Sequence, residues 1–234
     1  MSSVHVREQG VWFEDASCLN IEGIPYSPYS DSQLKKIEKA GRLCYKSEHL
    51  ATKESFASFI QKRIEDGHES IIEHSFLTFR YITNRAISHE LVRHRLASFS
   101  QESQRYVRYS EGNERKKFQV IRPFKYFSWS AETQNEWLST MEACFRTYSN
   151  LLNAGVQPQV ARDVLPNATK TEIIISANLR EWRHILALRM SKKAAPQMAQ
   201  LMTATYSILY KYYPSVFYDF DNQYLSLKDV SMEL

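Results

Sequence analysis

The stretch of the chain richest in possible ligand-binding groups is residues 93–106, with the sequence RHRLASFSQESQRY. It contains three arginines, one histidine, three serines, two glutamines and one glutamate. Guanidinium groups form parallel, charge-assisted hydrogen bonds with phosphate, and glutamine side chains match the amide edge of a pyrimidine or flavin ring. This composition favours an anionic ligand over the alternative, a solvated basic loop that forms surface salt bridges.

Two later segments place polar side chains against an apolar pattern. In NLREWRHILALRM, Asn178, Arg180, His184 and Arg189 interrupt a helix with an apolar face, and Arg162 lies within VARDVLP. Each arginine could bind an anionic ligand or form an ion pair within or between helices. The residues alone leave both interpretations open.

The histidines and cysteines argue against other chemistries. His68 and His74 are six residues apart, whereas helical metal sites use pairs four apart, so we expect no metal. Cys18, Cys44 and Cys144 form no metal or nucleophile pattern, and Cys144 falls on the apolar face of a predicted helix. The chain also has no G-x-S-x-G, Walker or GxGxxG motif, so any nucleotide cofactor must be bound in another way.

The bulk composition is that of an ordinary globular protein. The 234 residues are 43% hydrophobic and 24% charged, which predicts a single domain over residues 1–234. A net charge of +4 is weak for a nucleic-acid-binding protein. With no apolar signal region and no apolar run of about 20 residues, we expect no membrane segment and a cytoplasmic location.

The elements that must position these side chains are mainly helices. Apolar spacing predicts helices over residues 30–47, 53–68, 84–95, 131–155, 157–165, 179–190 and 194–213. Alternation and β-branched residues predict strands over residues 74–83 and 170–178, and residues 98–117 an ordered loop with a short strand at 105–109. We expect Ser30 or Asp31 to cap the first helix. The fold class is therefore α+β, one compact domain with a small mixed or antiparallel sheet flanked by helices.

Four segments together resemble the flavin-dependent thymidylate synthase family. GHESIIEHSFLTF, GVQPQVARDVLP and NLREWRHILALR are similar to three of its motifs, and RHRLASFSQESQRY is similar to its signature. That signature is R-H-R, a serine ten residues after the first arginine, then S-x-R-Y. The residues that fill it are Arg93, His94, Arg95, Ser103, Arg105 and Tyr106. The resemblance covers roughly residues 55–200 in the family's order.

The resemblance implies a reaction and its ligands. The family methylates dUMP to dTMP with methylenetetrahydrofolate as carbon donor, reduced FAD as hydride source and NADPH as reductant, without a cysteine nucleophile. It works as a homotetramer, with FAD and substrate at subunit interfaces. The residues implied for FAD are His68, Ser70, Arg93, His94 and Arg95, with Asn178, Arg180 and His184 from a neighbouring subunit. Those expected for dUMP are Glu90, Arg93, Gln101, Ser103, Arg105, Arg162 and Arg189. As catalytic residues we expect Arg189, near the uracil, and Ser103, as a binding group rather than a nucleophile.

One segment departs from the family pattern, and two alternatives remain. The family usually continues after the last arginine with a stretch like A-Q-W-E-I, whereas residues 194–198 are AAPQM. The change puts the start of the last helix in doubt and raises the alternative of a family member that binds FAD but not folate. The other alternative is a nucleic-acid-binding module in which Phe99, Tyr106 and Tyr109 stack on bases.

Overall fold

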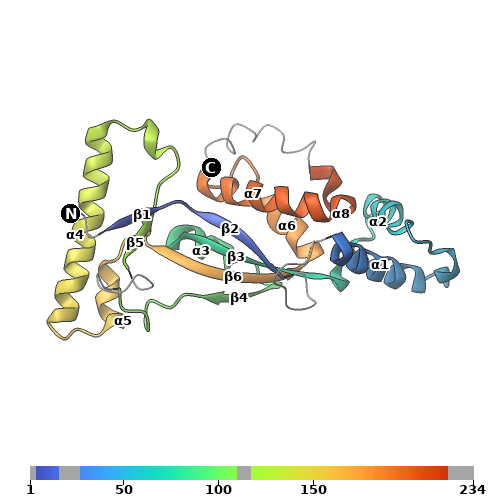
Figure 1. Ribbon diagram of the computed structural model, residues 1–234, viewed down its shortest axis with the longest axis horizontal. Helices are drawn as coiled ribbons and strands as arrows, with labels where there is room; N and C mark the ends of the chain where they lie inside the picture. Colours follow the sequence, from blue (N-terminus) through green and yellow to red (C-terminus); the bar gives the residue numbers. More distant parts are fainter. Residues whose placement is uncertain (1–3, 16–26, 110–116, 221–234) are drawn as a thin grey trace. The chain divides into compact units, whose positions relative to one another are not determined.

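A computed structural model describes residues 4–15, 27–109 and 117–220 (Figure 1). These residues form two compact units. The first unit is built from the residues up to Gly10, Tyr81–Arg93 and Phe99–Ile174, and the second from Val11–Arg80, His94–Ser98 and the residues after Ile174. Strands β3 and β6 each continue from one unit into the other.

The described strands are short and form two sheets. They are β1 (His5–Arg7), β2 (Gly10–Asp15), β3 (Phe76–Asn84), β4 (Ala97–Gln101), β5 (Gln119–Ile121) and β6 (Lys170–Asn178). One sheet has the order β2-β3-β6-β4, and the other pairs β1 with β5 in parallel. β3 and β6 are antiparallel, because Leu179 N donates to Ser75 O at one end and Arg85 N to Thr169 O at the other.

The structure describes eight α-helices. They are α1 (Ser27–Leu43), α2 (Phe56–Glu65), α3 (Arg85–Leu91), α4 (Ala131–Asn153), α5 (Pro158–Ala161), α6 (Leu179–Arg189), α7 (Pro196–Tyr212) and α8 (Pro214–Phe217). Short 3-10 turns are η1 (Glu48–Leu50), η2 (Glu69–His74), η4 (Tyr126–Ser128), η5 (Arg162–Val164) and η6 (Tyr218–Phe220). None of these described helices is long and apolar enough to cross a membrane.

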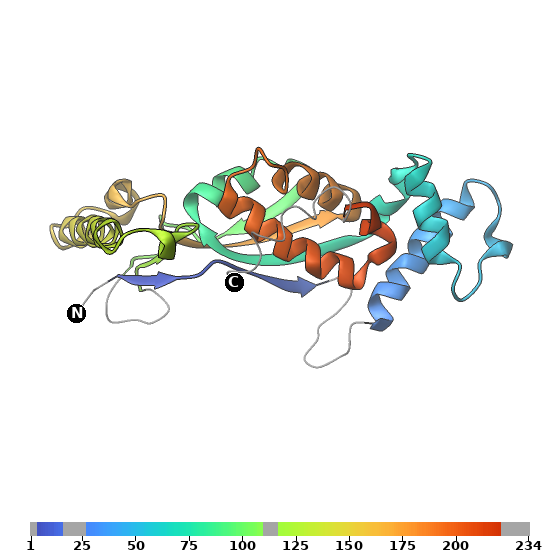
Figure 2. The same cartoon turned by 90° about the horizontal axis from the view of Figure 1, so that it is seen from above.

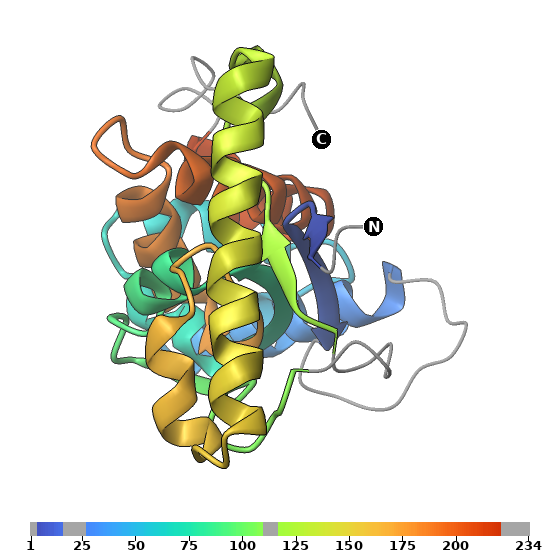
Figure 3. The same ribbon diagram turned by 90° about the vertical axis from the view of Figure 1, so that its left-hand side faces the viewer.

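The hydrophobic core of the first unit packs against one face of α4. The apolar stripe predicted for this helix buries Met141, Phe145 and Tyr148. The Phe145 ring stacks on Phe118 with the centroids 4.8 Å apart, and Tyr148 accepts a hydrogen bond from the backbone N of Tyr109. Figure 3 shows α4 along its whole length, with the short α5 beside its C-terminal end. The helix therefore forms because a face of period 3.6 can be buried against aromatic residues that precede it in the chain.

In the second unit, Trp182 of α6 packs against β3. This side chain is fully buried, donates from Nε1 to the carbonyl oxygen of Leu77 at 3.1 Å, and meets the Phe79 ring edge-on. It thereby joins α6 to the part of β3 that lies in the same unit. On its other side α6 contacts α7, which contacts α8, and these orange and red helices are seen together in Figure 2.

The α+β prediction is confirmed, and most predicted elements form. The strand predicted over residues 170–178 is β6 with the same bounds, and its buried residues alternate as a half-buried strand requires. Gly67 and Gly155 follow α2 and α4 with positive φ angles of 77° and 84°, which suits residues that end a helix. Pro196 occupies the first turn of α7, where its fixed φ is favourable, so the departure at residues 194–198 leaves the helix start intact.

Two local predictions were wrong, and three strands were not predicted. The first helix begins at Ser27, so neither Ser30 nor Asp31 caps it. Residues 105–109 form a turn and an irregular segment instead of a strand, and the strand of that region is β4, at Ala97–Gln101. The sequence analysis also missed β1, β2 and β5, whose short strands pair with segments far away in the chain.

Candidate ligand pocket and the polar network of α6

The predicted site residues divide between the two units by the ligand expected for them. The second unit contains most of those expected to bind FAD: His68, Ser70, His94, Arg95, Asn178, Arg180 and His184, together with Arg189. The first unit contains the remainder, most of which were expected to bind dUMP: Glu90, Arg93, Gln101, Ser103, Arg105 and Arg162. Each group is described within its own unit.

The second unit contains a cavity of about 700 Å³ beside α6. Three of the predicted residues line it: Asn178, Arg180 and His184. His68, Ser70, His94, Arg95 and Arg189 are not in its wall. The residues that complete the wall are Glu69, Glu73, Leu96, Glu181, Arg183, Ala187, Asp219 and Phe220.

The junction of β6 and α6 places the predicted residues in this wall. Asn178 ends β6 and caps α6, because its side-chain oxygen accepts a hydrogen bond from Glu181 N at 2.8 Å. Arg180 and His184 are four residues apart on one face of α6. Leu179 N and Glu181 N are already hydrogen-bonded, to Ser75 O and Asn178 Oδ1, but the positive end of the helix dipole still favours an anion at this end of the pocket.

The arginines of the pocket are already paired with carboxylates. Arg180 Nη1 lies 2.6 Å from Glu73 Oε1, and Arg183 binds Glu69 and Asp219. Four carboxylates and two guanidinium groups line the wall, so its arginines do not present a simple excess of positive charge. An anionic ligand therefore has to displace the exposed Arg180–Glu73 pair, which costs little because such pairs are weak in water.

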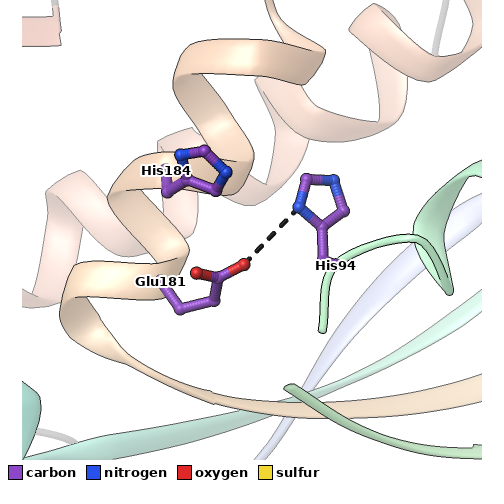
Figure 4. A group of neighbouring side chains, drawn as sticks. All are labelled: His94, Glu181 and His184. Carbon is purple, nitrogen blue, oxygen red and sulfur yellow. Dashed lines mark ion pairs between the residues drawn. The ribbon is translucent and has the colours of Figure 1, made fainter. Parts of the chain in front are cut away.

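Three neighbouring side chains form the most unusual group of the second unit: His94, Glu181 and His184 (Figure 4). His94 and Glu181 are buried, and His94 Nδ1 lies 3.5 Å from Glu181 Oε1. His94 Nε2 accepts a hydrogen bond from Arg189 Nε at 3.0 Å. Burial, with Arg189 and His184 nearby, lowers the pKa of His94 to about 4. At neutral pH the ring is therefore uncharged, and its contact with Glu181 is not an ion pair.

The hydrogen bond from Arg189 indicates which nitrogen of His94 carries the proton. An arginine can only donate, so Nε2 must offer its lone pair and the proton lies on Nδ1, toward Glu181. The same group has the ligand types of a metal site, with its ligand atoms within 4.8 Å of one another. A metal would need the lone pair of Nδ1, which this tautomer does not have, so the Arg189 bond opposes metal binding.

Protonation of His94 should lower the stability of the folded protein below pH 6.5. Folding lowers the pKa of this ring from 6.5 to about 4. The unfolded state therefore binds more protons in that interval, and the free energy of unfolding falls by up to about 1.4 kcal/mol per pH unit as the pH drops. Urea unfolding at about pH 7 and about pH 4.5 should show a larger loss for the wild type than for His94→Gln.

The His94→Gln comparison also separates His94 from its neighbour. Burial raises the pKa of Glu181, with His184 opposing, so Glu181 contributes with the opposite sign in both proteins. If the wild type and His94→Gln lose equal stability between about pH 7 and about pH 4.5, the His94 ring is not held neutral in the folded protein.

In the first unit, two residues expected at the substrate are already hydrogen-bonded. Gln101 Nε2 donates to Ser88 Oγ at 2.9 Å and to Thr171 Oγ1 at 3.1 Å, so both protons of its amide are in use. Ser103 Oγ accepts from Arg105 N at 3.3 Å. These contacts give Gln101 a role in holding β4 against β6, beside any role in reading a base.

Arg85 is a cation of the first unit that the sequence analysis did not single out. Burial lowers the pKa of Arg85, and Arg162 is near enough to lower it further. Two guanidinium groups held near each other favour an anion between or beside them. The only sequence signal was an arginine at the second position of the predicted helix over residues 84–95.

The aromatic side chains do not form the predicted base-stacking surface. Tyr109 is 5% exposed, and its hydroxyl group donates to Glu102 at 3.0 Å. Burial and the Glu102 charge raise the pKa of Tyr109. Tyr106 is 79% exposed, so the two rings share no exposed platform. This arrangement disfavours the nucleic-acid-binding alternative.

By fold and pocket, the chain is an α+β protein with a ligand-sized cavity at the N-terminus of a helix. The model of the family described as Thymidylate synthase complementing protein matches residues 28–215. A flavin-dependent thymidylate synthase of Mycobacteroides abscessus is 37% identical over 213 residues, which covers 85% of this chain and 84% of that protein. A protein of the same name from Mycobacterium avium is 36% identical over 211 residues, with the same coverage. The chain therefore belongs to the flavin-dependent thymidylate synthase family.

Proposed function

We propose that the protein is a flavin-dependent thymidylate synthase, which converts dUMP to dTMP with methylenetetrahydrofolate as carbon donor and NADPH as reductant. The observation that carries this proposal is the family match over residues 28–215, which includes all four motifs. FAD is the cofactor, and when bound it supplies the hydride. The enzyme is a cytoplasmic homotetramer, and residues 1–234 act as one domain.

The second unit offers a donor set that fits FAD. The helix N-terminus capped by Asn178 suits a pyrophosphate, with Arg180 beside it once its pair with Glu73 opens. His184 is exposed and lies in the same wall. His68, Ser70, Arg93, His94 and Arg95 are proposed to complete the FAD contacts.

The dUMP molecule is proposed to bind through Glu90, Arg93, Gln101, Ser103, Arg105, Arg162 and Arg189. The proximity of Arg162 to Arg85 supports a phosphate position in the first unit. Arg189 is proposed to polarise the uracil ring, and Ser103 to bind without attacking it. Electrostatic polarisation of this kind suits hydride delivery to a ring carbon.

A mechanism without a cysteine nucleophile agrees with the described cysteines. Cys44 follows α1 and is exposed, and its thiol contacts the carbonyl oxygen of Ala40 in the last turn of that helix. Cys144 is half-buried on α4 in the first unit, and neither lines the cavity. Cys18 lies outside the described residues.

Visible absorption of the purified protein tests the proposal first. We expect flavin bands that shift when dUMP is added, followed by formation of dTMP when methylenetetrahydrofolate and NADPH are supplied. A protein that is colourless and does not take up added FAD would contradict the proposal. Oxidation of NADPH without formation of dTMP would instead identify a family member that binds flavin but does not use folate.

A further inference from the structure

We propose that Glu181 is a positioning residue that acts through His94 on Arg189, an inference that rests on the proposed role of Arg189 at the uracil. The three side chains form one chain of contacts in the second unit. Arg189 Nε donates to His94 Nε2 at 3.0 Å, and His94 Nδ1 faces Glu181 Oε1 at 3.5 Å. Glu181 is not one of the residues that define the four family motifs.

The tautomer of His94 links the two ends of this network. Since Nε2 accepts from Arg189, the proton lies on Nδ1, and an acceptor on that side stabilises this form further. The Glu181 carboxylate is such an acceptor. It favours the Nδ1–H form of the ring and thus keeps Nε2 available to hold the Arg189 guanidinium in a fixed plane.

The local structure fixes Glu181 in this position. Its backbone N donates to the capping side chain of Asn178, so its place in the first turn of α6 is set by the helix cap. The residue is 5% exposed, and within the described part of the chain its carboxylate forms no ion pair with an arginine or lysine. Burying a carboxylate without a strong partner costs free energy, which is expected where a residue serves function more than stability.

A purely structural alternative is that the negative charge of Glu181 only stabilises the N-terminal turn of α6. The two roles predict different results. A carboxylate that acts by charge alone in a pocket for an anionic cofactor weakens FAD binding, so its removal should tighten FAD without loss of turnover. A carboxylate that positions Arg189 through His94 should, when removed, lower kcat/KM for dUMP.

The experiment compares Glu181→Ala and Glu181→Gln with Glu132→Ala, which removes an exposed first-turn acid of α4. For Glu181→Ala we expect kcat/KM for dUMP to fall about tenfold, the scale of one hydrogen bond to a charged group, while FAD affinity is kept or rises. Glu181→Gln should retain most of the activity, because its amide oxygen can also accept from Nδ1–H. Glu132→Ala should match the wild type. Wild-type kcat/KM in Glu181→Ala would overturn the proposal.

A second measurement does not depend on turnover or on any variant at Glu181. In protein labelled with ¹⁵N-histidine, the two-bond N–H correlations report which ring nitrogen carries the proton. The His94 signal is assigned as the one missing in His94→Gln. We expect the Nδ1–H tautomer in the wild type, and a mixture of tautomers in Glu181→Ala. An Nε2–H tautomer in the wild type would overturn the inference, even if the enzyme makes dTMP. The expected tautomer in a protein that makes no dTMP would instead place the failure in the proposed function.

Discussion

The variant Arg189→Ala should lose dTMP formation while it keeps bound FAD. Removal of one pre-placed electrostatic donor from a reacting group typically lowers kcat by about 10²–10³-fold, and we expect a loss of this size in kcat/KM for dUMP. Arg189 ends α6 and does not line the pocket that contains Asn178, Arg180 and His184, so FAD absorption should remain. Steady-state dTMP formation and flavin absorbance together measure both effects.

Two further variants make this result specific. Arg189→Lys keeps the charge but loses the planar fork and the Nε donor to His94, so we expect an intermediate loss of turnover. Arg146→Ala removes an exposed arginine of α4 and should behave as the wild type. Unchanged turnover in Arg189→Ala would remove this residue from the substrate site. A loss of FAD in the same variant would reassign it to the cofactor.

The local elements around the site could be predicted because their signals are local. The β-branched run KTEIIISAN predicts a strand, and the helical spacing after Asn178 predicts α6, both with the observed bounds within one residue. The asparagine at the junction is a favoured N-cap residue, and the structure uses it as one. These features depend on side chains within a few positions of each other.

The pairing of charges could not be predicted because it joins residues far apart in the chain. Arg180 binds Glu73, which precedes it by 107 residues, and nothing in the spacing of NLREWRHILALR indicates that partner. The sequence analysis left open whether the arginines of this segment form ion pairs, and only the structure identifies the carboxylates of η2 as their partners. The strands β1 and β5 were missed for the same reason, because three-residue strands are defined by their pairing and not by their own sequence.

The polar network around Glu181 could be predicted only in part from the sequence. A glutamate and a histidine three residues apart, as Glu181 and His184 are, lie on one face of a predicted helix. The sequence analysis considered histidine pairs and passed over this spacing. The third member, His94, comes from another segment, and its tautomer depends on a bond that only the fold creates. The sequence could thus indicate a polar pair on α6 but not its function.

Replacement of Arg183 by methionine should strongly destabilise the second unit. Arg183 is 8% exposed and forms a two-pronged pair with Asp219, with Nη1 and Nη2 at 2.8 and 2.7 Å from the two oxygens. Nη1 also donates to the carbonyl oxygen of Val216, and the guanidinium lies over the Phe220 ring. Burial alone would lower the pKa of Arg183, but the bonds and charge of Asp219 raise it above its ordinary value.

Because α6 is bound to α8 and η6 through this one side chain, its loss leaves a carbonyl and a carboxylate without their partner. Removing one member of such a buried pair typically costs about 3–5 kcal/mol, and we expect the lower end because Asp219 stays partly exposed. Urea unfolding at a fixed protein concentration measures the change, with Arg146→Met as an exposed control expected to stay within about 0.5 kcal/mol. If Arg183→Met and Arg146→Met unfold alike, the pair does not hold these helices together. If the double variant Arg183→Met with Asp219→Asn is more stable than Arg183→Met alone, the cost lies in the unpaired carboxylate and not in lost packing on Phe220.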